Sequence, residues 1–206
     1  MHENARLYQV IMIEPGVHPD TYIHIRILMG MVTSLALARL LTGLARFVQH
    51  PGRLRVHWIH IGWVAFLLLA VLRFWWFEYT LSAVSSWNFA RFVFVTGFAA
   101  LHFFLATMLF PDDISEFDGY RGYMEARRGW FFGLVAALLT VDLIDTLLKG
   151  HEYYSRLAFG FPWADLLLIA GALLATRLAS NTYNVIYLGA CLLSQALWVL
   201  FRTGSM

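Results

Sequence analysis

The hydrophobic residues of this 206-residue chain fall into six long stretches separated by short polar breaks. A helix needs about 20 apolar residues to cross roughly 30 Å of hydrocarbon, and every stretch is close to that length or longer. The pattern therefore predicts an all-α protein, a six-helix transmembrane bundle. The predicted spans cover residues 23–47, 56–78, 89–110, 129–148, 159–178 and 183–202.

The polar segments are too short to form a second folded domain. Residues 1–22 lack the basic start, apolar run and small-residue cleavage site of a signal peptide, so we expect an interfacial segment followed by one transmembrane domain, residues 23–206. The longest break, residues 111–128, mixes acidic, aromatic and Arg residues and predicts a short interfacial helix. Asp112 and Asp113 are expected to cap the N-terminus of that helix, since their spacing matches no calcium loop.

The composition agrees with a membrane protein and argues against several other classes. Apolar residues make up 60% of the chain, against roughly 45–50% in soluble domains. The net charge of +2 does not favour a nucleic-acid partner. The single Cys191 lies inside the last span, and no zinc spacing, phosphate loop or hydrolase motif is present. We therefore expect the lipid bilayer as the main partner, no metal site and no enzymatic activity.

The orientation in the membrane follows from the basic residues of the short breaks. Breaks 1–2, 3–4 and 5–6 share one face and carry more Arg than the other face does. The bias towards basic cytoplasmic loops places that face in the cytoplasm and both termini outside, in a multi-pass protein of the inner-membrane type. The two sets are Arg46, Arg53, Arg55, Arg121, Arg127 and Arg128 against Arg6, Lys149, Arg156 and Arg202.

Several ionisable residues lie inside the outer half of the predicted spans, with Glu78 near the surface. Asp142 and Asp145 are three residues apart and share a helix face, so a cation or an Arg is expected between them. Two interpretations stay open for this outer layer: an Arg–Asp cluster that fixes helix packing, or a path for a cation or proton. The layer comprises Asp142, Asp145, Asp165, Arg73 and Arg26.

The inner half of the spans carries Arg and His but no acidic residue between the helix ends. Arg39 lies deep in its span and is expected either to bind an anion or a lipid phosphate or to pair with the C-terminal carbonyls of a broken helix. His60 and His102 are expected either to form hydrogen bonds in the packed interior or, as a pair, to ligate a b-type haem. No other cofactor is expected.

Two segments raise the question of an internal repeat. LLLAVLRFWW in the second span and GALLATRLAS in the fifth both place an Arg after a Leu/Ala run. Two three-helix halves with inverted topology would explain the match, and chance would explain it equally well. Six short helices are few for a solitary transporter, so a homo-oligomer is expected.

The stretch LMGMVTSLALARLLTGLARFVQHPGRLRVHWIHIGW joins an Arg/Gly/Arg helix through a basic loop to a helix rich in Trp and His. This pattern, over roughly residues 23–78, resembles a family of small uncharacterised bacterial integral membrane proteins. The resemblance implies a bacterial membrane location and no particular activity. The leading functional hypothesis is a channel or transporter for an ion or small solute. The alternatives are a haem-containing redox protein and a non-catalytic subunit or signalling component.

Overall fold

The computed structural model describes residues 19–50, 56–78, 81, 87–149 and 162–203 of the chain. Within these residues the protein is all-helical, with seven helices and no strand. The helices are α2 (Pro19–Gln49), α3 (Trp58–Phe77), α4 (Phe89–Leu109), α5 (Gly119–Ala126), α6 (Arg128–Leu148), α8 (Trp163–Ala175) and α9 (Asn181–Thr203).

Five of these helices are long and apolar enough to cross a membrane, namely α2, α3, α4, α6 and α9. The predicted span at residues 159–178 differs, because its described helix covers only the 13 residues Trp163–Ala175. At 1.5 Å per residue such a helix is about 20 Å long, short of the roughly 30 Å of a hydrocarbon core. The length of the fifth span is therefore the main departure from the predicted bundle.

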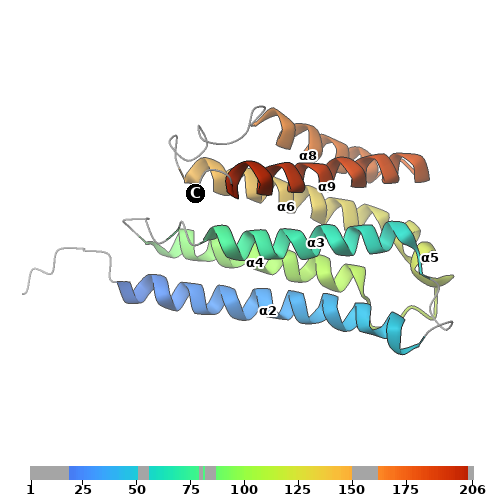
Figure 1. The fold of residues 1–206 in the computed structure, drawn as a ribbon, viewed down its shortest axis with the longest axis horizontal. Helices are drawn as coiled ribbons and strands as arrows, with labels where there is room; N and C mark the ends of the chain where they lie inside the picture. The colour runs from blue at the N-terminus through green and yellow to red at the C-terminus, as the bar shows by residue number, and fades with distance from the viewer. Residues whose placement is uncertain (1–18, 51–55, 79–80, 82–86, 150–161, 204–206) are drawn as a thin grey trace, which may run out of the picture.

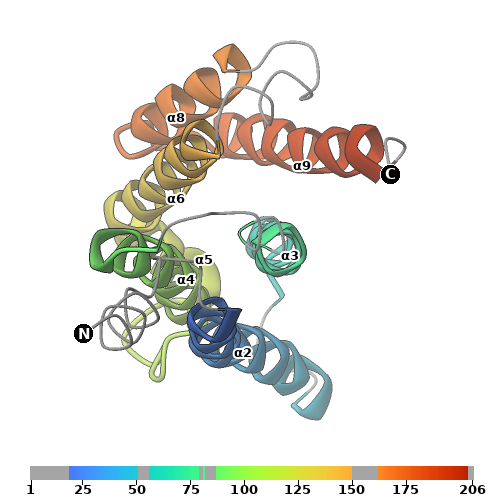
Figure 2. The ribbon, with the colours of Figure 1, turned by 90° about the vertical axis from the view of Figure 1, so that its left-hand side faces the viewer.

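The six elements other than α5 run alternately in opposite directions along the long axis of the molecule (Figure 1). Viewed end-on, close packing follows the order α2, α4, α6, α8, α9, α3 and back to α2, with α3 also against α4 (Figure 2). One end of the bundle carries α5, and we refer to it as the α5 end. The opposite end, where α2 begins and α6 and α9 finish, is called the Lys149 end.

The two predicted three-helix halves pack differently from each other. In the first half the first and third helices, α2 and α4, form the most extensive contact, whereas in the second half α6 packs mainly on α8 rather than α9. The two matched Arg residues also differ in position, since Arg73 lies inside α3 and Arg177 lies beyond the end of α8. The described helices therefore give no structural counterpart to the sequence match.

Large aromatic side chains fill the interior towards the α5 end. Trp63 of α3 is fully buried, and its ring centroid lies 5.2 Å from Phe131 and 5.5 Å from Phe132 of α6. Gly43 of α2 faces the ring of Phe110, where any larger side chain would overlap that ring. The absence of a Cβ at this position lets the end of α4 pack directly on α2.

The short helix expected within residues 111–128 is present as α5, but its N-terminus lies later than expected. Gly119 adopts a φ of 66° and starts the helix. Asp113 instead accepts a hydrogen bond of 2.8 Å from the Ser115 amide, and Asp112 forms an ion pair with Arg39. The prediction that Asp112 and Asp113 cap this helix was therefore wrong.

Candidate functional site: the buried charge cluster between α3 and α6

The helices α3 and α6 lie on opposite sides of the bundle interior, and their backbones are not close neighbours. Only long side chains can therefore connect them. Towards the α5 end the connection is aromatic, through Trp63 and the Phe residues of α6. Towards the Lys149 end it is ionic, and the five residues that form it are called the buried charge cluster: Arg73, Glu78, Asp142, Asp145 and Lys149.

The deeper part of this cluster is an ion pair between α3 and α6. Arg73 Nη2 donates to Asp142 Oδ2 over 2.6 Å. The two side chains are 15% and 26% exposed. The guanidinium also lies over the ring of Trp198 in α9, 4.8 Å from its centroid. Arg73 thus joins three helices, and it brings together two of the residues that the sequence singled out.

The outer part of the cluster is a Lys shared by two carboxylates. Lys149, which caps the C-terminus of α6, lies 2.6 Å from Asp145 Oδ2 and 3.0 Å from Glu78 Oε1. The three side chains are only 5–8% exposed. The hydrophobic pattern predicts Glu78 and Lys149 at the surface and does not predict this contact of Lys149 with two carboxylates. The available signal was the spacing of Asp145 and Lys149, which puts an acid and the chain's only Lys one helical turn apart.

Among the described residues, the cluster contains more acidic than basic groups. Its three carboxylates face two cations, so these five groups carry one negative charge in excess when all are ionised. Asp165 of α8 lies within electrostatic reach of Asp142 and Arg73, and it adds a second. Glu78 Oε2 is buried and has no hydrogen-bond partner among the described residues. An excess of negative charge in a buried site is relieved by taking up a proton or a cation.

The cation expected beside Asp142 and Asp145 is present, since Arg73 pairs with Asp142 and Lys149 pairs with Asp145. The position of Arg26 differs from the expectation. The guanidinium of Arg26 lies over the ring of Trp75, 5.3 Å from its centroid, so Arg26 belongs to the contact between α2 and α3. The structure therefore divides the predicted layer into a cluster around α6 and a separate cation–aromatic contact.

In the inner layer, Arg39 has an acidic partner from beyond the helix ends. Arg39 Nη2 lies 2.6 Å from Asp112 Oδ1, and the two side chains are 25% and 88% exposed. Asp112 follows the C-terminus of α4, so the segment after a helix supplies the missing acid. Depth along the spans alone could not reveal this pair.

The two candidate His residues lie in different aromatic surroundings. His60 is buried, shares a 2.7 Å hydrogen bond with the Leu109 carbonyl and stacks on Tyr120 at 4.3 Å. His102 is also buried, and its Nδ1 lies 2.9 Å from the Phe98 carbonyl oxygen of its own helix. Each imidazole therefore has one ring nitrogen engaged by the backbone. Among the described residues, no group of three or more His, Cys, Asp or Glu side chains is arranged to hold a metal ion.

Comparison of the chain with protein-family models, with curated protein sequences and with solved structures found no match. The resemblance of residues 23–78 to a family of small bacterial membrane proteins therefore stays a prediction. Function is inferred below from the geometry and charge of the buried charge cluster.

Proposed function

We propose that the chain is a six-span protein of a bacterial inner membrane that conducts protons through the buried charge cluster, as a channel or transporter. The observation that carries this proposal is the buried Lys149 ammonium between two carboxylates. It belongs to a described cluster in which carboxylates outnumber cations. Four carboxylates within electrostatic reach of two cations favour cationic cargo over anionic cargo.

The polar groups form a series that leads inward from the Lys149 end. The first groups of the series are Glu78, Asp145 and Lys149. Asp142 follows about 10 Å further along α6 from Lys149, since it lies seven residues before Lys149 in the helix. His102 comes next, because its ring packs 4.9 Å from that of Phe74, the neighbour of Arg73 in α3. These groups all exchange protons, so they supply steps for a relay.

The aromatic packing beyond the cluster favours a proton over a hydrated metal ion. Between the cluster and the α5 end lie three buried aromatic rings that contact one another, those of Trp63, Phe131 and Phe132. A hydrated cation needs an open passage through such a layer. A proton needs only groups that come within hydrogen-bonding distance of one another during side-chain motion.

The proposed orientation places the α5 end in the cytoplasm. Among the described basic residues, Arg46, Arg121, Arg127 and Arg128 belong to the helix ends and the short helix at that end, whereas Arg91 in the first turn of α4 and Lys149 lie at the other. Pro19 and Thr203 lie at the Lys149 end, so both termini are proposed to be outside. A homo-oligomer is consistent with this proposal and does not depend on it.

The haem alternative has weaker support from the geometry. A b-type haem needs two imidazoles directed at one iron. The rings packed on His60 are Phe47, Phe110 and Tyr120, whereas those packed on His102 are Phe74 and Phe98. The two imidazoles thus share no ring neighbour, and we favour the proton path. A Soret band in the purified protein would favour the haem alternative instead.

Proton flux into reconstituted vesicles tests the proposal. The full-length protein is placed in vesicles that hold a pH-sensitive dye, and a potassium diffusion potential drives uptake. We expect flux in the wild type and a loss of about 100-fold in Asp142→Asn, the lower end of what a positioned proton-transfer group contributes. Glu125→Gln is the matched control, because Glu125 pairs with Arg121 on the surface of α5 and is 57% exposed.

A second variant separates lost conduction from lost folding. Arg73→Gln combined with Asp142→Asn removes both charges of the pair and leaves neither partner uncompensated. We expect this double variant to be folded and still without flux. A folded wild-type protein that carries no flux would contradict the proposal and favour a non-catalytic subunit or signalling component. Flux that survives Asp142→Asn would exclude Asp142 from the path.

A further inference from the structure

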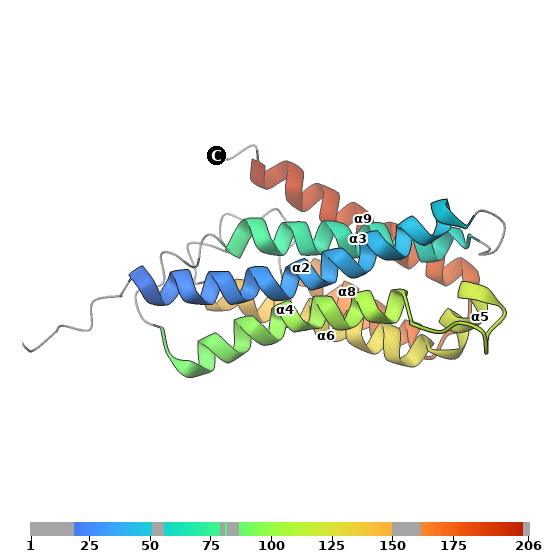
Figure 3. The same cartoon turned by 90° about the horizontal axis from the view of Figure 1, so that it is seen from below.

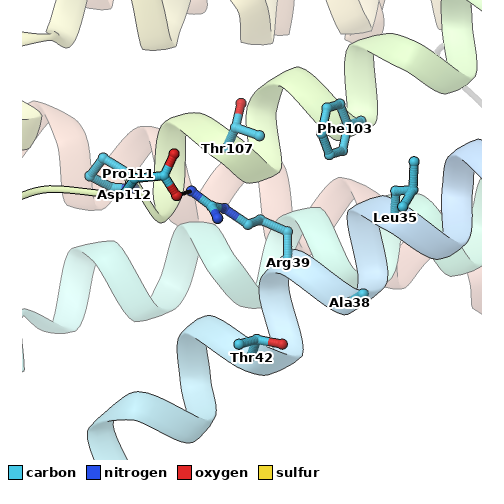
Figure 4. A pocket seen from close by; sticks show the side chains of 8 residues that line it. All are labelled: Leu35, Ala38, Arg39, Thr42, Phe103, Thr107, Pro111 and Asp112. Carbon is cyan, nitrogen blue, oxygen red and sulfur yellow. Dashed lines mark hydrogen bonds and ion pairs between the residues drawn. The ribbon is translucent and has the colours of Figure 1, made fainter.

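A groove lies between α2 and α4 towards the α5 end, away from the buried charge cluster. Figure 3 shows the two helices diverging towards that end, and side chains from both helices line a volume of about 550 Å³ there. Its lining residues are Leu35, Ala38, Arg39, Thr42, Phe103, Thr107, Pro111 and Asp112 (Figure 4).

The groove joins an apolar part to one cationic end. Leu35 and Phe103 lie at one end, and the small side chain of Ala38 leaves space beside them. The Arg39 guanidinium points the other way, towards Pro111 and Asp112 after the C-terminus of α4. An apolar groove with a cation near the helix ends suits a ligand that has an apolar chain and a negatively charged head group.

The groove is on a surface that the bilayer would cover. Neighbouring side chains on α2 and α4 are apolar and exposed, including Met31, Leu41 and Phe104. Helices of this length and composition place such side chains against lipid chains. A lipid can therefore enter the groove sideways from the membrane without crossing an aqueous phase.

The ion pair with Asp112 does not use every donor of the Arg39 guanidinium. Its ion pair with Asp112 uses Nη2, and the buried Nε has no hydrogen-bond partner among the described residues. A guanidinium presents five N–H donors in a planar fork that suits two oxygens of a phosphate. Asp112 is 88% exposed and lies in the segment after α4, so solvent is available to it if it leaves Arg39.

We propose that this groove binds one anionic phospholipid from the leaflet at the α5 end. The lipid phosphate binds the Arg39 guanidinium in place of Asp112, and one acyl chain lies along Leu35 and Phe103. Thr42 lies one turn further along α2 and also lines the groove. This proposal concerns a different site from the proton path and holds whether or not the protein conducts protons.

Native mass spectrometry of the full-length, delipidated protein in detergent tests this proposal. Phosphatidylglycerol, phosphatidylcholine of the same chain length and inorganic phosphate are titrated separately. We expect one phosphatidylglycerol to bind about tenfold more tightly than phosphatidylcholine, the size of a charge-assisted contact, and inorganic phosphate not to compete at equal concentration. Equal affinity for the two lipids would overturn the proposal, and so would phosphate binding as tightly as phosphatidylglycerol.

Three variants connect the binding to this groove. Arg39→Gln should lower the phosphatidylglycerol affinity about tenfold, whereas Arg121→Gln, which removes a surface Arg of the same end, should leave it unchanged. Ala38→Leu should lower the affinity for both lipids by filling the groove. An unchanged affinity in both Arg39→Gln and Ala38→Leu would overturn the proposal.

Asp112→Asn separates lipid binding from a merely structural ion pair. If the lipid phosphate replaces Asp112 on Arg39, removing the carboxylate should raise the phosphatidylglycerol affinity severalfold, since a competing anion is gone. A lower affinity in Asp112→Asn would contradict the displacement and overturn the proposed mode of binding.

Discussion

Two Arg–Asp ion pairs of equal length occupy opposite halves of this molecule. Arg73–Asp142 and Arg39–Asp112 both measure 2.6 Å, yet the first lies between α3 and α6 with side chains 15% and 26% exposed, whereas Asp112 of the second is 88% exposed. An exposed ion pair contributes about 0–1 kcal/mol, whereas removing one partner of a buried pair costs about 3–5 kcal/mol. The length of an ion pair therefore does not decide how much it stabilises the fold, and the difference in burial predicts that the buried charge cluster contributes more than the Arg39–Asp112 pair.

The largest effect is expected at Lys149. Lys149→Met removes the ammonium that lies between Asp145 and Glu78 and leaves two buried carboxylates uncompensated. We expect the free energy of unfolding to fall by about 3–5 kcal/mol, measured by denaturant titration in detergent. Adding Glu78→Gln and Asp145→Asn should restore most of the loss. If Lys149→Met alone were as stable as the wild type, the buried charge cluster would not stabilise the protein more than the Arg39–Asp112 pair does.

A somewhat smaller effect is expected at the deeper ion pair. Arg73→Leu leaves Asp142 without its partner and also removes the cation from the Trp198 ring. The cost should be roughly 3 kcal/mol, the order of an unpaired charge inside a membrane helix. Adding Asp142→Asn should recover part of this loss in the same unfolding measurement. If the double variant were less stable than Arg73→Leu alone, the two residues would not act as a pair.

The Arg39–Asp112 pair should contribute little to stability, in contrast to the buried charge cluster. Arg39→Gln is expected to change the free energy of unfolding by less than about 1 kcal/mol, because Asp112 is 88% exposed beyond the end of α4, where water and salt screen the pair. The measurement is the same denaturant titration, carried out with and without added anionic lipid. A loss as large as that of Lys149→Met would show that Arg39 is as essential to the fold as the buried charge cluster.

The smallest effect on stability is expected from two probes of orientation. Arg53→Cys and Thr203→Cys place thiols in the segment that follows α2 in the sequence and at the last residue of α9, and the native Cys191 is buried. With the α5 end in the cytoplasm, an impermeant thiol reagent added to intact cells should label position 203 and not position 53. Labelling of position 53 from outside would contradict the proposed orientation. The α5 end, with the Arg39–Asp112 pair, would then lie on the outer side.

The hydrophobic pattern was enough to predict most of the helices because the length of an apolar run is a local property. Five of the six predicted spans are helices long and apolar enough to cross a membrane. A rise of 1.5 Å per residue also placed Arg73 and Asp142 at a common depth, which is where they meet. Span order and helix length thus predicted one ion pair between residues 69 positions apart.

Partners that depend on helix rotation and on the segments between helices required the tertiary structure. The rotation of α3 relative to α6 decides that Glu78 turns inward to Lys149, and hydropathy does not encode this rotation. Asp112 reaches Arg39 from the segment after α4, whose direction is set by the packing of Phe110 on Gly43. The amino-acid sequence by itself determined the depth of each charged group, because depth follows from position along a helix. The tertiary structure decided which charges pair and which are buried, because both depend on how neighbouring helices face one another.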